Sequence, residues 1–274
     1  MTTGGWGSTE SAQAWQRGAE LRNRMLAAAT ERMFAAARIA PGMRVLDVGT
    51  GSGDTAIMLA ERVGPTGSVI ATDVSPTMIA AAESTVRTLG LGNVTLQVMD
   101  GAALTLPDAH VDAVVARKSL MFVGDLAACL AGIRRVLRPH GWLAAVVWST
   151  LERNPFHHAL FEGVRAHGAL PTPPPELVHA FARTTPGAWR PALDAAGFHD
   201  VSIEPIPSTR TYPSVTDAIT TAKASPIYVE MLSALDDQQR AAAWSDIERR
   251  LTKLAGPSGF MSPMESLLLS GRKD

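Results

Sequence analysis

Apolar residues in the first part of the chain recur at the three- and four-residue spacing of a helix. The stretch covers residues 9–39, with Leu21 and Met25 on its apolar face, and Pro41 ends it. Gly18 is a candidate break, because glycine weakens the interior of a helix. We therefore expect helix before the first strand, divided in two if Gly18 interrupts it.

After residue 43 the pattern changes to short apolar runs that alternate with helical stretches. Five runs predict strands, at residues 44–48, 68–73, 94–98, 111–116 and 142–148. Two further strands are expected at 199–206 and 265–270. These strands are apolar almost throughout, which is typical of a parallel sheet covered by helices on both faces.

The order of these elements predicts an α/β fold with a doubly wound, mostly parallel seven-stranded sheet. We expect one structural domain with a helical segment at 1–40, a core at 41–150 and a remainder at 151–274 that completes the sheet. Two insertions in that remainder, at about 155–195 and 211–263, are expected to form a helical cap.

Composition narrows the possible partners. The 274 residues include 25 Lys plus Arg against 26 Asp plus Glu, so the net charge of −1 gives no electrostatic case for nucleic acid or an anionic membrane. The one cysteine, Cys129, excludes an internal disulfide and a cysteine-based metal cluster, and we expect no metal. No apolar run is long enough for a membrane span, and the first residues lack the pattern of a secretory signal. The expectation is a soluble, cytoplasmic protein.

A glycine-rich loop follows the first expected strand. Its residues Gly49, Gly51 and Gly53 let the backbone pass close to a ligand, at the point where an open parallel sheet binds one. Asp54 stands where a dinucleotide fingerprint needs its third glycine, and no Lys-Ser or Lys-Thr pair follows as in a phosphate loop. Asp47 precedes the loop, and its carboxylate favours a cationic ligand over a pyrophosphate.

Two more acidic residues follow the next two strands. Asp73 ends the second strand, where a carboxylate accepts hydrogen bonds from the two hydroxyls of a ribose, and Asp100 follows the third. The alternatives are structural: a strand-end cap at Asp47, and turn formation at Asp73 and Asp100. Taken together, the loop and the acidic residues resemble the class I S-adenosylmethionine-dependent methyltransferases, a family with a Rossmann-like sheet. The resemblance covers residues 40–150 and is closest to the ubiquinone/menaquinone-biosynthesis-type branch that acts on small molecules.

The resemblance implies that S-adenosylmethionine is the cofactor and that 41–150 is the core that binds it. It implies a set of cofactor-binding residues: Asp47, Gly49, Thr50, Gly51, Gly53, Asp73, Val74, Met78, Asp100, Gly101, Ala102 and Arg117. Arg117 is equally well explained as a partner in a salt bridge on the surface. The cap is far longer than in the quinone enzymes, so a quinone substrate does not carry over.

Methyl transfer from a sulfonium needs a general base only for a hydroxyl or ammonium acceptor, so no universal catalytic triad is expected. His157 and His158 follow the fifth strand and are the candidate bases, although neighbours on a helix point about 100° apart and cannot both face one pocket. His110, His140 and His199 precede their strands and belong at the opposite edge of the sheet. Polar groups beyond the carboxyl ends of the strands include Lys118, Arg210 and Tyr212.

The sequence thus predicts a methyltransferase acting on a small, apolar metabolite enclosed by the cap, with the acceptor atom (C, O or N) undetermined. The residues expected to contact the substrate are Trp15, Met121, Trp148, Phe156, Tyr228 and Met231. Two alternatives remain: an enzyme of the same fold that catalyses a cyclisation without methyl transfer, and a non-catalytic protein that binds S-adenosylmethionine. The sequence leaves homo-oligomer formation open.

Overall fold

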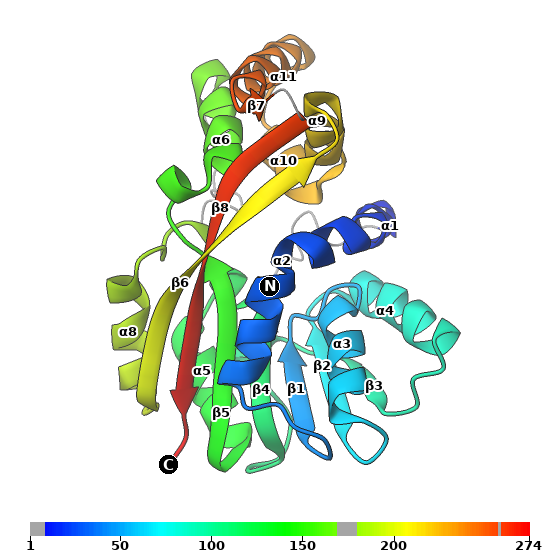
Figure 1. Ribbon diagram of the computed structural model, residues 1–274, viewed down its shortest axis with the longest axis vertical. Coiled ribbons are helices and arrows are strands. Elements are labelled where there is room, and N and C mark those ends of the chain that lie inside the picture. The colour runs from blue at the N-terminus through cyan, green and yellow to red at the C-terminus, as the bar shows by residue number, and fades with distance from the viewer. Residues whose placement is uncertain (1–8, 169–179, 257–258) are drawn as a thin grey trace.

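A computed structural model describes residues 9–168, 180–256 and 259–274 (Figure 1). One sheet runs through the molecule with its strands in the order β3-β2-β1-β4-β5-β8-β6, and β7 pairs with β8 beside this row. The strands are β1 Arg44–Val48, β2 Ser68–Asp73, β3 Val94–Val98, β4 Val111–Arg117, β5 Leu137–Trp148, β6 His199–Tyr212, β7 Ala255–Gly256 and β8 Gly259–Arg272.

The sheet is mostly parallel, which confirms the predicted fold. Strands β1 to β5 pair in parallel, whereas β8 pairs antiparallel with β5, β6 and β7. The expected seven strands are all present, and the two-residue β7 is an eighth that the sequence pattern did not predict. Strand β1 lies between β2 and β4. The connection leaving β1 runs toward β2 and the one leaving β4 runs toward β5, so they separate and open a crevice at the carboxyl ends of β1 and β4.

Helices surround the sheet. They are α1 Thr9–Arg17, α2 Ala19–Ala36, α3 Asp54–Val63, α4 Pro76–Thr88, α5 Leu126–Val136, α6 Pro155–His167, α8 Pro186–Ala195, α9 Val215–Ala224, α10 Pro226–Met231 and α11 Asp237–Thr252, with short 3-10 turns η2 Gly101–Ala103, η3 Leu120–Phe122 and η4 Leu151–Arg153. The predicted break at Gly18 is confirmed, because this residue separates α1 from α2. No helix within the described ranges is both long and apolar enough to cross a membrane.

Both faces of the sheet are buried, as the apolar strands predict. Neighbouring residues of a strand point to opposite faces, so Val45 joins one core cluster and Leu46 the other. Met33 of α2 packs in the cluster of Val45, and Trp189 of α8 packs in that of Leu46. Helices α2 and α8 thus cover opposite faces. Helix α8 lies within the first insertion, which was expected to belong to the cap, but it packs on β6 instead.

Strands β6 and β8 are longer than the sequence pattern predicted. Each has 14 residues, whereas runs ending at 206 and starting at 265 were expected. The extra halves pair with each other as a two-stranded ribbon, with Tyr212 opposite Phe260. Strand β6 continues past Pro205 and Pro207 because it is an edge strand, where a residue without an N–H is tolerated.

The cap stands on this ribbon. Figure 1 shows α6, α9, α10 and α11 around the far ends of β6 and β8, beyond the carboxyl end of β5. Helix α11 packs along α6, where Gly163 faces Ile247 closely enough that a Cβ on Gly163 would lie 2.3 Å from Cγ1 of Ile247. Residues 169–179 of the first insertion lie outside the described part of the chain.

The contact between α6 and α11 predicts a stability difference between two glycines. Gly163→Ala should lower the free energy of unfolding by about 1–3 kcal/mol, the range for overpacking a core, because Ile247 has to move. Gly187→Ala in α8 is the matched control, since its Cβ meets no atom within 4 Å and alanine favours a helix by about 0.5–1 kcal/mol. Denaturant titration of both variants checks this, and equal stability would contradict the packing described.

Candidate active site

A cavity of about 520 Å³ lies beyond the carboxyl ends of the parallel strands. One end is lined by the loop after β1 and by Asp73 and Asp100, and the other by Phe156, His157 and Arg210 of the cap and ribbon. The volume is in the usual range for a small-molecule site. Among the described residues there is no cluster of His, Cys, Asp and Glu that could hold a metal ion.

The glycine loop packs too tightly for side chains. Gly49 has a φ of 73°, and a Cβ there would lie 2.3 Å from Cβ of Ser119, which follows β4. Gly51 has a φ of 57°, and its Cβ would lie 3.1 Å from Nε1 of Trp15 in α1. Both positions therefore require glycine, and the backbone between them forms one wall of the cavity.

Asp73 at the end of β2 holds the loop from the side. One carboxylate oxygen accepts the N–H of Gly51 at 2.9 Å, and the other accepts that of Ser75 at 2.9 Å. Burial raises the pKa of this carboxyl, and the hydrogen bonds from Ser75 and Gly51 oppose that rise. The backbone N–H of Val74 adds a third hydrogen bond to this carboxylate, which can accept about four and which lines the cavity.

Asp47 lies behind the loop and is fully buried. Neither of its carboxylate oxygens has a hydrogen-bond partner among the described residues, and the same holds for the Thr50 hydroxyl. Burial raises the pKa of Asp47 to about 7. An uncompensated buried carboxylate is costly, so the loop favours a ligand that brings positive charge or proton donors over one that brings a phosphate.

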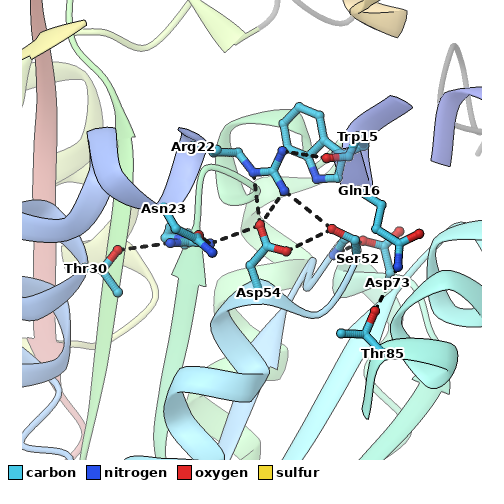
Figure 2. A network of polar contacts seen from close by, with 11 residues as sticks. Trp15, Gln16, Arg22, Asn23, Thr30, Ser52, Asp54, Asp73 and Thr85 are labelled. Atoms are coloured by element: carbon cyan, nitrogen blue, oxygen red, sulfur yellow. Dashed lines mark hydrogen bonds and ion pairs between the residues drawn. The ribbon is translucent and has the colours of Figure 1, made fainter. Parts of the chain in front are cut away.

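A buried ion pair ties the N-terminal helices to the loop (Figure 2). Asp54, the first residue of α3, accepts a hydrogen bond from Nε of Arg22 in α2 at 3.1 Å, and its other oxygen accepts the hydroxyl of Ser52. Arg117 at the end of β4 lies 3.6 Å from the same carboxylate. Arg22 also lies 3.9 Å from the ring centroid of Trp15, so α1 and α2 sit over the loop as its roof.

Three further hydrogen bonds complete this roof. Arg117 donates to Asn23 at 2.9 Å and to Thr30 at 3.1 Å, both in α2. Gln16 of α1 donates to Thr85 of α4 at 2.9 Å (Figure 2). Burial lowers the pKa of both Arg22 and Arg117, while the charge of Asp54 opposes that shift. A surface salt bridge, the alternative for Arg117, is wrong, because the side chain is buried, pairs with the buried Asp54 and lines the cavity.

The sequence analysis missed Arg22 and Asp54 as parts of the site. A signal for Arg22 exists, because it lies four residues before the buried Leu26 and therefore continues the buried face of α2. Asp54 gave a weaker signal, since an acidic residue in the first turn of a helix is common for reasons of helix dipole alone.

The candidate bases separate as expected for helical neighbours. His157 is buried and lines the cavity, whereas His158 is half-buried and does not. Nε2 of His157 lies 3.1 Å from a guanidinium nitrogen of Arg210, and Nδ1 contacts the Tyr228 hydroxyl. Burial, followed by the charges of Arg210 and Lys118, holds the pKa of His157 well below its usual range. His157 is therefore neutral, and both of its ring nitrogens are engaged.

The structure brings most of the other predicted residues to the cavity wall. Those that line it are Gly49, Thr50, Gly51, Asp73, Val74, Met78, Asp100, Gly101 and Arg117 at the loop end, and Trp15, Met121, Trp148, Phe156 and Tyr228 elsewhere. His110, His140 and His199 are absent from the wall, and His199 pairs instead with Asp274 at the opposite edge of the sheet.

Five predicted residues do not line the cavity: Asp47, Gly53, Ala102, Met231 and His158. Gly53 turns away into α3, where its Cβ position meets Ala82, and Ala102 contributes only a backbone N–H to Asp100. Met231 is fully buried in the apolar core, so a direct substrate contact is wrong for it in this structure.

The ion pair beneath the roof predicts a large stability effect. Asp54→Asn should lower the free energy of unfolding by about 3–5 kcal/mol, because it leaves two buried guanidinium groups without a counter-charge. Glu20→Gln, which breaks an exposed pair with Arg24 on the same helix α2, should cost less than about 1 kcal/mol. Denaturant titration measures both, and equal costs would mean that the roof does not depend on Asp54.

Comparison with known proteins identifies the domain. Residues 45–141 match the family model of the methyltransferase domain. The chain is similar to the nocamycin O-methyltransferase of Saccharothrix syringae, at 29% identity over 85% of this chain and 86% of that protein. It is 34% identical to the ubiquinone/menaquinone biosynthesis C-methyltransferase of Shewanella frigidimarina over 50% of this chain, and spans 56% of that enzyme.

A solved structure agrees on the fold. The geranyl diphosphate C-methyltransferase of Streptomyces coelicolor A3(2), crystallised with S-adenosyl-L-homocysteine, superposes with a TM-score of 0.56 over 92% of this chain and 80% of that one, at 15% identity. The glycine loop after β1 and the acidic end of β2 both fall inside the matched domain, residues 45–141. Residues 45–141 therefore form a methyltransferase domain whose cofactor is S-adenosylmethionine, and the chain as a whole is similar to class I methyltransferases of the small-molecule type.

Proposed function

We propose that the protein transfers the methyl group of S-adenosylmethionine to a small metabolite enclosed by the helical cap, by in-line displacement. The observation that carries this proposal is the continuity of one cavity of about 520 Å³ from the glycine loop to the aromatic side chains of the cap. A cofactor at the first end and an acceptor at the second would share this space, so the reacting atoms could meet without a further opening.

The loop end fits this cofactor on three grounds. The unpartnered carboxylate of Asp47 suits a ligand that carries an ammonium and a sulfonium. Asp73 lines the cavity at the end of β2, where a carboxylate can accept hydrogen bonds from the hydroxyls of a ribose. The close backbone approach at Gly49 and Gly51 leaves room for a ligand against the loop.

We assign the cofactor contacts accordingly. Asp73 holds the ribose, and Val74 and Met78 flank the adenine with Asp100 and Gly101 at its edge. Gly49, Thr50 and Gly51 border the methionine part. Arg117, with Asn23 and Asp54, holds the roof above it. Asp47, Gly53 and Ala102 do not contact the cofactor directly. Asp47 acts through its charge, and Gly53 and Ala102 fix the shape of their loops.

When bound, the cofactor supplies an electrophilic methyl carbon on a good leaving group, so the chain has mainly to position the acceptor. Fixing two reactants in a near-attack geometry contributes about 7–11 kcal/mol to lowering a barrier. Trp148, Phe156, Tyr228 and Met121 give the cavity largely apolar walls around the acceptor, and Trp15 lies against Gly51 of the loop.

We further propose that His157 acts as a positioning residue. Arginine only donates hydrogen bonds, so Nε2 of His157 accepts from Arg210. The proton of the neutral ring is then on Nδ1 and is donated to the Tyr228 oxygen. His157 therefore orients Arg210 and Tyr228 and does not itself take a proton from an acceptor.

The test is a methyl-transfer assay with labelled S-adenosylmethionine and a panel of small C-, N- and O-acceptors. A methylated product formed one for one with S-adenosylhomocysteine supports the proposal. A rearranged or cyclised product with no S-adenosylhomocysteine released would mean that the fold serves a different reaction. Binding of S-adenosylmethionine with no product from any acceptor would favour a non-catalytic protein.

The role of Asp73 predicts a loss of cofactor affinity. Asp73→Ala should weaken S-adenosylhomocysteine binding about 10- to 150-fold, the range for losing a charge-assisted hydrogen bond of about 1.5–3 kcal/mol. Asp108→Ala is the control, because Asp108 is exposed and pairs only with Arg135 outside the cavity. Titration calorimetry measures both, and unchanged affinity in Asp73→Ala would overturn the cofactor assignment.

The position of the histidines predicts which of them affects turnover. His157→Ala should lower kcat about 10- to 100-fold, because misplacing groups at the acceptor end weakens the near-attack geometry. His140→Ala should leave kcat within about threefold, since His140 contacts Arg272 at the opposite edge of the sheet. Turnover is measured per folded molecule, after a melting curve. If His140→Ala lost turnover but still melted cooperatively, the assignment of the active site to the carboxyl ends of the strands would be wrong.

A further inference from the structure

The acceptor end of the cavity contains a buried arginine that has no counter-charge. Arg210 of β6 is 9% exposed, and its guanidinium donates to the Tyr212 hydroxyl and to His157, each at 3.1 Å. It also lies 4.5 Å from the ring centroid of Phe156 and 3.7 Å from the sulfur of Met264. None of these neighbours is an acid.

Lys118 adds a second basic group at this end. Its ammonium nitrogen donates to the carbonyl of Val147 at 3.0 Å and to the hydroxyl of Ser266 at 2.7 Å, and lies 3.5 Å from the ring centroid of Trp148. Burial, and then the charges of Arg210 and Arg117, hold the pKa of Lys118 well below its usual range. Its backbone φ of 59° is rare for a residue other than glycine, and such backbone strain is found most often at functional positions.

The two arginines at the loop end, unlike Arg210, have a carboxylate as counter-charge. Arg22 and Arg117 share the carboxylate of Asp54. Over the described ranges of the chain, no carboxylate comes within ion-pair distance of either Arg210 or Lys118. A buried charge is normally paired, so the guanidinium of Arg210 lacks a negative partner, which a ligand at the acceptor end can supply.

Two tyrosines that line this end, Tyr212 and Tyr228, add hydroxyl groups that can donate. The Tyr228 oxygen accepts the Nδ1 proton of His157, and the Tyr212 oxygen accepts from Arg210. Each oxygen therefore keeps its own O–H, and the described residues offer neither of these O–H groups an acceptor. Burial raises the pKa of Tyr228, so it stays protonated. Arg210, Tyr212 and Tyr228 together form a surface of donors among apolar walls.

We propose that the acceptor substrate carries an anionic oxygen group, which binds to Arg210 and Tyr228 with Lys118 beside them. The group is a carboxylate or the conjugate base of an acidic enol or phenol. This inference rests on the proposed function, because it names the chemistry of the molecule that occupies the acceptor end. The rest of that molecule is apolar, to match Phe156, Trp148 and Met121.

The test uses protein saturated with S-adenosylhomocysteine and small aromatic probes of similar shape. The probes are 1-naphthoate, its neutral analogue 1-naphthamide, and 2,4-dinitrophenolate, with binding followed by calorimetry. We expect at least one of the two anions to bind about tenfold or more tighter than the amide, as for a charge-assisted hydrogen bond. Preference for naphthoate indicates a carboxylate substrate, and preference for the phenolate indicates an acidic enol or phenol.

Arg210→Gln should reduce the preference for the anion to less than about threefold. Tyr228→Phe, which keeps the ring and loses only the hydroxyl, should weaken anion binding and provides a second variant if the first does not fold. Arg165→Gln is the control, because Arg165 is an exposed arginine on cap helix α6 that pairs with Glu162. It should leave the preference unchanged.

Two results would overturn the inference. In the first, wild-type protein binds the amide as tightly as both anions. In the second, Arg210→Gln weakens S-adenosylhomocysteine binding as strongly as it weakens anion binding, which would mean that Arg210 holds the carboxylate of the cofactor. Neither result affects the proposed methyl transfer itself, whereas failure of wild-type protein to bind S-adenosylhomocysteine would count against the proposed function and not against the donor surface.

Discussion

The buried carboxylate of Asp54 is the interaction on which the site depends. Asp54 is the first residue of α3, directly after the glycine loop, and its carboxylate pairs with Arg22 of the roof and with Arg117 at the end of β4. One side chain thus fixes three elements relative to each other: the loop, the N-terminal helices and the sheet. Without it, two guanidinium groups would be buried without a counter-charge, and the roof that brings Trp15 against Gly51 would lose its anchor.

The two ends of the cavity differ in their electrostatics. The loop end has an excess of carboxylates, with Asp47 unpartnered and Asp73 lining the wall. The acceptor end has basic groups and hydroxyl donors without a carboxylate among the described residues. A cationic cofactor and an anionic acceptor would therefore each bind at the end of opposite charge, and the field along the cavity would orient both.

The sequence predicted the parts of this arrangement that depend on local pattern. The strands, the break at Gly18 and the loop with Asp73 followed from apolar period, glycine spacing and the rule that parallel strands bind ligands at their carboxyl ends. Side-chain pairs between residues far apart in the sequence, such as Arg22 with Asp54, could not be predicted, because they leave no local pattern. The reach of β6 past Pro207 was missed because its edge position depends on the strand order.

The central claim is that one cavity holds the cofactor at the loop and the acceptor at the cap. A crystal structure of the complex with S-adenosylhomocysteine tests it most directly. The account predicts that the ribose hydroxyls lie within hydrogen-bond distance of the Asp73 carboxylate and that the sulfur points toward Trp148 and Phe156. A complex with the adenosine between Arg210 and Tyr228, or with the ribose away from Asp73, would contradict it.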